Sequence, residues 1–394
     1  MLKRQCDQVL KKSKNLQNEL PQSSHLPHIG IDCRLSGVRH AGIGRYVSNL
    51  VQELLPLLKS KATLVLFFFD EIQQREVIGE NTPPNCEVVF APVQHYSFAE
   101  QLRLPSIFQK AKLDLLHAPH FNVPIFYRGK YVVTIHDLLW HEHKGRAVTT
   151  LTPIQYWLKY WLYLFVVKKA VERAAKIFVP SQTVKNAIVN RFSEVENKTV
   201  VTYEGVGSGL KKASPVPERK KKILLYVGSL YPHKNVSRIF SAMVKDKSYR
   251  LVIVTARTAF VDRVKSEIME LGINDRVELR FEIPDASLAR LYHEAAVLVQ
   301  PSLAEGFGLT GIEAMALGTP VVASDIPIFR EVYDSVANFF DPNSSESLLK
   351  AIAKSENRLV SSQDSIKLLE KFSWKSLAKQ TLSSYIEVLS FRKE

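Results

Sequence analysis

Short apolar segments alternate with longer amphipathic segments along the first half of the chain. The apolar segments are rich in β-branched and aromatic residues, which is typical of strands buried on both faces of a sheet. They cover 28–35, 63–70, 86–93, 114–119, 131–137, 176–181 and 198–205. Segments with helical spacing, such as 43–58 and 181–192, fall between them. This alternation predicts a parallel sheet wrapped in helices.

The alternation stops at 205–222, a stretch rich in glycine, proline and charge that is typical of an interdomain linker. It then begins again. The later apolar segments are 222–229, 249–256, 276–283, 296–302, 320–325 and 337–342, and helical runs cover 235–245, 259–271, 285–295 and 309–317. We therefore expect an α/β protein of two doubly wound, Rossmann-like domains that face each other across a cleft. Ligands of such sheets bind beyond the carboxyl ends of the strands.

The predicted division of the chain has five parts. They are a polar, basic N-terminal extension (1–27), a first domain (28–205), a linker (206–222), a second domain (223–375) and a C-terminal helix (376–394) that packs back on the first domain.

The composition indicates the cellular compartment and the chemical class of the binding partners. The three cysteines, Cys6, Cys33 and Cys86, have no metal-ligand spacing and predict a reducing compartment. The first 27 residues lack the apolar core of a signal peptide, and no apolar run reaches the roughly 18 residues of a membrane span. We expect a cytoplasmic protein. Its formal net charge of +14 favours phosphate-bearing partners, which are nucleic acid, anionic lipid or a nucleotide, and charge alone does not choose between them.

A glycine-containing segment, GVRHAGIGRYVSNL, follows the first predicted strand and begins a helix. Gly42 and Gly44 let a ligand approach helix N-terminal amides, which bind anions, and Arg39 and Arg45 favour phosphate there. The alternative is a tight turn that merely joins strand to helix.

Two polar residues follow predicted strands. His136 is placed to act as a base or to hydrogen-bond a substrate hydroxyl; the alternative is a structural histidine paired with Asp137. Lys234 lies in a strand-to-helix turn, where an ammonium group neutralises a phosphate leaving group; the alternative is a solvated surface lysine. No metal-ligand spacing unites the other histidines near His136, so we predict no metal site. These are His117, His120, His141 and His143.

The segment AEGFGLTGIEAMALGTPVVAS (304–324) places Glu305 in a glycine loop and Glu313 in the helix that follows. The apolar positions of this helix recur at helical spacing, so Glu313 points away from the core. Two acceptor carboxylates beside helix N-terminal amides suit a ligand that carries vicinal hydroxyls on a diphosphate. A sugar nucleotide is such a ligand.

Together with YVGSLYPHKN, GIGRYVSNL and TIHDL, this segment resembles the retaining glycosyltransferases of family 4, which have the GT-B fold, from about residue 28 to the end. The resemblance implies that Glu305 contacts the donor sugar and that Glu313 binds the ribose. Lys234 stabilises the departing diphosphate, and His136 orients the sugar. The resemblance places further donor contacts at Gly42, Gly44, Ser229, Phe307, Gly308 and Leu309.

The chain departs from the family pattern at two places. Ser229 stands where many relatives have a phosphate-binding arginine, so Lys234 carries more of that work. The stretch VIVTARTAF lacks the glycine that commonly follows this strand, so the resemblance does not identify the loop that binds the nucleotide base.

The resemblance also implies the chemistry and the partners. In retaining transfer a leaving phosphate oxygen takes the acceptor proton, so no cofactor or protein base is needed. We expect GDP-mannose as donor, with UDP-sugars as the alternative, and a glycan or lipid-linked acceptor. The helix 152–176, with Trp157, Tyr160, Trp161 and Tyr163, suits an anionic membrane surface. Its alternative is packing against its own sheet.

Rival functions remain at this point. A retaining glycosidase uses two carboxylates but needs them on opposite sides of a sugar. A sugar-nucleotide epimerase shares the two-domain fold. A basic nucleic-acid-binding protein explains the charge, yet no nucleic-acid motif is present, so we expect no nucleic acid partner.

Overall fold

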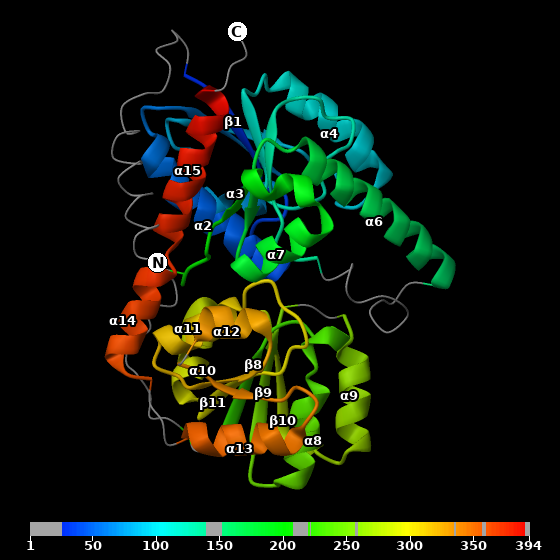
Figure 1. The fold of residues 1–394 in the computed structure, drawn as a ribbon, viewed down its shortest axis with the longest axis vertical. Helices are drawn as coiled ribbons and strands as arrows, with labels where there is room; N and C mark the ends of the chain where they lie inside the picture. The colour runs from blue at the N-terminus through cyan, green and yellow to red at the C-terminus, as the bar shows by residue number, and fades with distance from the viewer. Residues whose placement is uncertain are drawn as a thin grey trace.

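The computed structural model describes residues 26–138, 152–207, 220, 222–256, 259–334, 336–356 and 360–390. The predicted linker and the N-terminal extension lie mostly outside these residues, as do His141 and His143. The described part contains two parallel sheets, one above the other in Figure 1.

The first sheet has seven strands in the order β3-β2-β1-β4-β5-β6-β7. The strands are β1 (His28–Asp32), β2 (Thr63–Phe68), β3 (Cys86–Phe90), β4 (Leu115–Ala118), β5 (Tyr131–Thr134), β6 (Ile177–Val179) and β7 (Thr199–Val201). The helical segments are η2 (Val38–His40), α2 (Ala41–Leu58), α3 (Glu71–Ile78), α4 (Phe98–Lys110), α6 (Pro153–Arg173), α7 (Gln182–Arg191) and η4 (Ser193–Lys198). Every strand pair is parallel, as expected where helices connect successive strands.

The second sheet has six strands in the order β10-β9-β8-β11-β12-β13. The strands are β8 (Ile223–Val227), β9 (Arg250–Thr255), β10 (Val277–Phe281), β11 (Val297–Gln300), β12 (Val321–Ser324) and β13 (Asn338–Phe340). The helical segments are η6 (Pro232–Lys234), α8 (Ser237–Lys245), α9 (Val261–Glu270), η7 (Asn274–Arg276), α10 (Asp285–Glu294), α11 (Leu309–Ala316), α12 (Pro327–Tyr333), α13 (Ser345–Glu356), α14 (Ser362–Lys371) and α15 (Trp374–Ser390).

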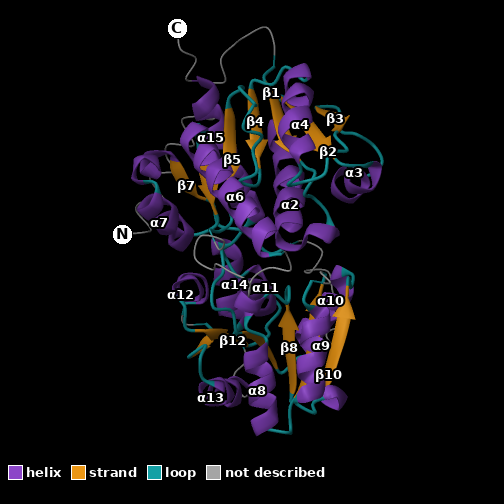
Figure 2. Ribbon diagram, turned by 90° about the vertical axis from the view of Figure 1, so that its right-hand side faces the viewer, coloured by secondary structure: helices purple, strands orange, loops and turns teal. Residues whose placement is uncertain are grey.

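Apolar cores lie on both faces of both sheets. In the first domain, α2 packs on one face, and α4, α6 and α7 pack on the other. In the second domain, α10, α11 and α12 cover one face, and α8, α9 and α13 cover the other. The predicted fold of two doubly wound domains is therefore confirmed. Figure 2 shows β8 and β10 ending on the side that faces the first domain, so their carboxyl ends border the region between the sheets.

The last helix, α15, belongs to the core of the first domain although it follows the second along the chain. Leu377 and Tyr385 are buried against the residues of α2, and α15 runs beside the first domain in Figure 1. The buried His117 of β4 contacts the hydroxyl group of Tyr385 through Nδ1 at 2.5 Å. The helix begins at Trp374, inside the range predicted for the second domain; the domain boundaries stay a prediction.

Candidate functional site

The loop between β11 and α11 is held in one conformation by Gly308. Its φ of +91° lies in the left-handed region, and a Cβ atom there would lie 2.3 Å from the hydroxyl oxygen of Tyr333. That hydroxyl donates to the carbonyl oxygen of Gly308 at 2.6 Å. Phe307 anchors the other side of the turn, because its ring is buried against Phe372. The turn therefore directs the N-terminal amides of α11, which no side chain caps, in a fixed direction.

The same loop presses against the first domain at Gly306. A Cβ atom on Gly306 would lie 2.2 Å from the backbone oxygen of His136. Ser181, at the start of α7, donates its hydroxyl hydrogen to the carbonyl oxygen of Gly306 at 3.0 Å. Only glycine permits this approach between the two domains. The glycine-loop motif gives no sign of this role of Gly306, because the neighbouring backbone comes from the other domain.

Lys234 and Glu305 form an ion pair between η6 and the glycine loop, with Nζ and Oε1 2.5 Å apart. Their side chains are only 16% and 17% exposed. Ser302 donates a further hydrogen bond to Glu305 at 3.2 Å. Lys234 is therefore not a solvated surface lysine, and the ammonium group and the carboxylate lie side by side.

Glu313 is buried, and one of its partners comes from the first domain. Its carboxylate accepts hydrogen bonds from the hydroxyl of Tyr292 at 3.0 Å and from the guanidinium of Arg45 in α2. Burial raises the pKa of Glu313, and the nearby Arg45 opposes that rise. The attraction of Glu313 in turn raises the pKa of Arg45, which also pairs with Asp285 at 2.8 Å. We expected Arg45 beside phosphate, whereas the structure pairs it with the predicted ribose carboxylate.

His136 lies beyond the carboxyl end of β5, as expected, but its partners differ from the predicted ones. Its Nε2 is 3.0 Å from the carbonyl oxygen of Pro119, and its Nδ1 is 3.5 Å from Glu204 Oε1. The ring of Tyr46 packs edge-on against the imidazole at 4.7 Å. The acidic partner found at the ring is thus Glu204 rather than Asp137. Sequence analysis missed Glu204, although a glutamate that ends an apolar strand segment is a usable signal.

The two glycines at the start of α2 have different surroundings. A Cβ atom on Gly44 would lie 1.9 Å from the carbonyl oxygen of Gly37, so the tight-turn interpretation accounts for Gly44. A Cβ atom on Gly42 would meet nothing within 4 Å, so Gly42 borders open space. No side chain caps the N-terminus of α2, which leaves its first amides available to an anion.

The remaining candidates lie on the same side of the second sheet. Ser229 follows β8, and its carbonyl oxygen accepts a hydrogen bond from Tyr226 at 2.5 Å. Leu309 begins α11 and contacts the apolar cores of both domains.

A cavity of about 180 Å³ opens between the domains next to Glu305. The first domain contributes residues after β5 and from α7, and the second contributes the glycine loop and the start of α12. Its lining is Asp137, Leu138, Thr183, Val184, Ala187, Leu303, Ala304, Glu305, Ile326, Pro327 and Ile328. Glu305 is the candidate residue that lines this cavity, which lies at the carboxyl ends of both sheets, the usual ligand position in doubly wound domains.

Comparison with known proteins identifies the family. The model described as Glycosyltransferase Family 4 matches residues 40–207, and the model described as Glycosyl transferases group 1 matches residues 210–367. The O-antigen chain mannosyltransferase RfbU of Salmonella typhimurium is 30% identical over 267 residues, which are 67% of this chain and 71% of RfbU. The chain belongs to glycosyltransferase family 4. The O-antigen chain mannosyltransferase B of Escherichia coli is 26% identical over 87% of this glycosyltransferase and 95% of its own length.

Solved structures support the fold of the glycosyltransferase. Sucrose-phosphate synthase from Thermosynechococcus elongatus has a TM-score of 0.70 at 20% identity, covering 93% of this chain and all of that one. Anabaena Alr3699/HepE, in complex with UDP and glucose, has a TM-score of 0.69 at 18% identity, covering 92% and 99%. The architecture is GT-B.

The described part of the chain offers neither a cluster of metal ligands nor a membrane-crossing helix. No group of three or more histidine, cysteine or acidic side chains there is arranged to hold a metal ion. Among the helices of that same part, none combines the length and the apolar character that crossing a bilayer requires.

Proposed function

We propose that this glycosyltransferase moves a hexose, with mannose favoured, from a nucleotide sugar to a glycan or lipid-linked acceptor. The transfer belongs to cell-envelope polysaccharide synthesis, retains the configuration of the anomeric carbon and needs no metal ion. The observation that carries the proposal is the grouping at one end of the second sheet. Lys234 and Glu305 follow the neighbouring strands β8 and β11, the uncapped N-terminus of α11 comes directly after the loop of Glu305, and the buried Glu313 lies on that same helix. Cations and amides suit a diphosphate, and carboxylates suit sugar hydroxyls.

The mechanism follows from these groups. As the bond between the anomeric carbon and the phosphate oxygen breaks, negative charge builds up on the diphosphate. Lys234 and the amides at Gly308 and Leu309 stabilise that charge in place. The released phosphate oxygen takes the proton of the acceptor hydroxyl, whose oxygen bonds to the same face of the sugar. His136 and Glu305 hold the donor sugar, and orientation supplies the rest of the rate enhancement.

Ligand entry requires an exchange of partners at Lys234. Its ammonium group pairs with Glu305. A nucleotide sugar offers phosphate oxygens to Lys234 and hydroxyl groups to Glu305, so both side chains keep charge-assisted hydrogen bonds.

The donor proposal of GDP-mannose rests on the two relatives that are named mannosyltransferases. A UDP-sugar remains the alternative, with glucosyl or N-acetylglucosaminyl transfer, because ribose and diphosphate are common to both nucleotides. The proposed contacts at Glu313 and Lys234 therefore do not distinguish them. The nucleotide base is the group whose identity the experiment has to settle.

A membrane-facing acceptor is supported by α6. One side of this helix packs on the sheet through Tyr156, Tyr160 and Tyr163, as the packing alternative expected. The opposite side is also apolar, with exposed Ile154, Trp157, Leu158, Trp161, Leu162 and Phe165. Lys168 and Lys169 follow on the last turns. An exposed apolar stripe next to lysines suits the surface of an anionic bilayer.

Binding and turnover test the proposal together. Thermal-shift measurements with GDP-mannose and UDP-glucose should raise the melting temperature for the true donor, since a ligand that binds only the folded state stabilises it. Glu313→Ala and Lys234→Ala should lose that shift and the transfer activity, whereas the exposed Glu346→Ala serves as the control. If neither nucleotide sugar stabilises the protein, or if both variants keep full turnover, the proposed site is wrong.

Membrane binding is tested separately. The full chain should sediment with phosphatidylglycerol vesicles and not with phosphatidylcholine vesicles, and Trp161→Glu should abolish this while leaving transfer to a water-soluble acceptor intact. Equal sedimentation of wild type and Trp161→Glu would contradict the role of α6.

Three other results would favour the rival functions. Hydrolysis of a simple glycoside without nucleotide would indicate a glycosidase, and epimerised donor without acceptor would indicate an epimerase. Salt-sensitive binding of nucleic acid that Glu305→Ala does not affect would indicate a nucleic-acid-binding protein.

A further inference from the structure

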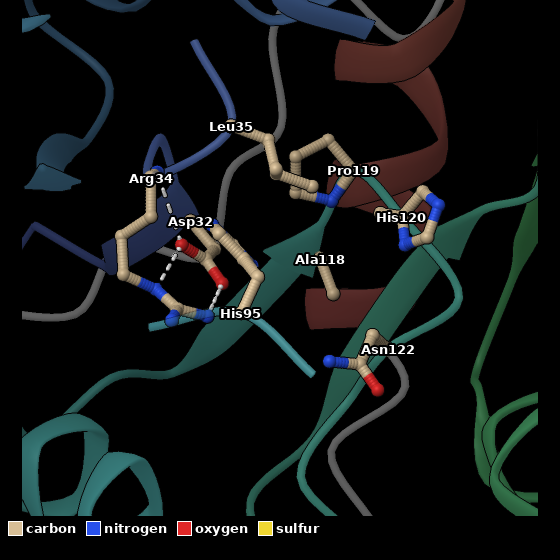
Figure 3. Close-up of a pocket in the computed structure, with 8 residues that line it drawn as sticks. All are labelled: Asp32, Arg34, Leu35, His95, Ala118, Pro119, His120 and Asn122. Carbon is tan, nitrogen blue, oxygen red and sulfur yellow. Dashed lines mark hydrogen bonds and ion pairs between the residues drawn. The ribbon is translucent and has the colours of Figure 1, made fainter. Parts of the chain in front are cut away.

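A second, polar pocket lies in the first domain, at the carboxyl ends of β1 and β4 (Figure 3). These neighbouring strands mark the point where the strand order of the sheet reverses, which is the usual ligand position in doubly wound folds. Asp32, Arg34, His95, Pro119, His120 and Asn122 are among its lining residues. Its volume of about 10 Å³ is room for a single water molecule or hydroxyl group.

The walls of the pocket are held by a buried charge network. Arg34 donates to both oxygens of Asp32, from Nε at 2.9 Å and from Nη2 at 2.7 Å, as the dashed lines in Figure 3 mark. The same guanidinium donates to Glu100 at 2.8 Å and to the carbonyl oxygen of Val93 at 2.8 Å. Burial acts to raise the pKa of Asp32, but the attraction of Arg34 prevails and lowers it. Arg34 thus pairs with both carboxylates, Asp32 and Glu100, and the surplus charge of these three groups is negative, so the network has no free cation for an anionic ligand.

His95 is the exception in this network. Its Nδ1 is 3.3 Å from Glu100 Oε1, while the other carboxylate oxygen accepts from the amide of Tyr96 at 2.8 Å and from Asn122. Its Nε2 is buried and has no hydrogen-bond partner. With the proton on Nδ1 facing Glu100, Nε2 carries a lone pair and accepts a hydrogen bond. A buried acceptor left unsatisfied is unfavourable, so this atom indicates a missing donor.

The pocket adjoins the proposed reaction centre. Pro119, one of its walls, has its carbonyl oxygen 3.0 Å from Nε2 of His136. The ring of His95 is 6.2 Å from that of His40, the residue that precedes α2. The larger cavity begins at Asp137, the residue after His136. The small pocket thus lies within the first domain, beside the residue whose carbonyl oxygen contacts His136.

We propose that this pocket receives one hydroxyl group of a glycan acceptor, which donates its hydrogen to Nε2 of His95. The inference rests on the proposed function and deepens it. A site of this size, with an open acceptor at His95 and surplus negative charge in its walls, suits a neutral sugar hydroxyl rather than a phosphate. His95 is then a positioning residue that selects the acceptor, and the hydroxyl it binds is a neighbour of the one that attacks.

Kinetics with hydroxyl-deleted acceptors test this assignment. Octyl glycosides of mannose, glucose, galactose and rhamnose are screened with the donor, and monodeoxy analogues of the accepted sugar are then compared. His95→Ala should raise the KM for the acceptor about tenfold, as expected for one lost hydrogen bond. The KM for the donor and the slow hydrolysis of donor without acceptor should stay unchanged. His28→Ala, at the opposite end of β1, is the control.

The deciding result is a loss of discrimination. One monodeoxy analogue should be a poor acceptor for the wild type yet no worse than the parent sugar for His95→Ala. If every analogue keeps its wild-type penalty in the variant, the proposal is overturned. A crystal structure of an acceptor complex supplies a second test: an acceptor hydroxyl within hydrogen-bond distance of His95 Nε2 supports the site, and a dry pocket or a water molecule that stays there with the acceptor bound contradicts it. Failure of any nucleotide sugar to bind would refute the proposed function instead.

Discussion

Removal of Arg45 isolates the contribution of one charge pair between the domains. Glu313 is 0% exposed, and its carboxylate has two hydrogen-bonding partners, Arg45 and Tyr292. Arg45→Ala leaves a buried carboxylate with the tyrosine hydroxyl alone. Asp285→Ala removes the other partner of the same arginine, but that side chain is 48% exposed. The two variants therefore compare the loss of the buried Arg45–Glu313 pair with the loss of the exposed Arg45–Asp285 pair.

The expected magnitudes differ clearly. Stripping the partner from a buried charge destabilises proteins by about 3–5 kcal/mol. The lower end applies here, because Arg45 is itself 30% exposed and separation of the domains would let water reach Glu313. An exposed pair contributes about 1 kcal/mol or less, so Asp285→Ala should have little effect. We expect a difference of roughly 2 kcal/mol between the variants.

The pH dependence identifies the cause. Burial raises the pKa of Glu313, and loss of Arg45 raises it further. A group whose pKa is higher in the folded than in the unfolded state stabilises the fold below its unfolded pKa and loses that contribution as pH rises through the folded pKa. The deficit of Arg45→Ala should thus be large at pH 8 and small near pH 5. Urea unfolding followed by tryptophan fluorescence at both pH values measures it. Equal stability of Arg45→Ala and Asp285→Ala at pH 8 would refute the reasoning.

Three further predictions concern single residues. Gly308→Ala should destabilise the second domain by several kcal/mol and abolish donor binding. Gly272 is also at positive φ but has no atom near its Cβ position, so Gly272→Ala should lose only about 1 kcal/mol of stability. Thermal melts of the two variants measure the difference. Glu331→Ala should weaken the start of α7 by about 1 kcal/mol, because this carboxylate accepts from the amides of residues 182 and 183, and faster hydrogen exchange there would reveal it. Burial lowers the pKa of His117 to about 3, so stability should fall as pH drops from about 6.5 toward 3, and His117→Gln should flatten the melting temperature between pH 4 and 7.

Local patterns in the sequence predicted the sheets and most of the candidate loop positions. Apolar runs bounded by glycine or polar residues specify buried strands, because the signal is contained within each segment. The glycine at 308 was likewise predictable as a turn. What the pattern did not contain was the partner of each side chain. Arg45 and Glu313 are 268 positions apart, and their contact depends on how the two domains face each other.

The same limit explains the histidine and the capping contacts. Sequence neighbours suggested Asp137 for His136, whereas parallel strands bring the end of β7, with Glu204, to the same edge of the sheet as β5. Glu331 binds the start of α7 from the other domain. Each missed contact is long-range, and each depends on tertiary geometry that periodicity does not encode.

The two motif glutamates are each paired with a cation, and this pairing constrains what the cleft accepts. Glu305 is held by Lys234 within the second domain, and Glu313 is held by Arg45 from the first. A ligand that brought only negative charge would satisfy the cations but leave each carboxylate with a single hydroxyl donor, Ser302 for Glu305 and Tyr292 for Glu313. A ligand that brought only hydroxyls would do the reverse. Because an unsatisfied buried charge is so unfavourable, the arrangement favours a molecule that carries both anionic and hydroxyl groups at a fixed spacing. A sugar joined to a nucleoside diphosphate meets that requirement, whereas free phosphate or a free sugar does not.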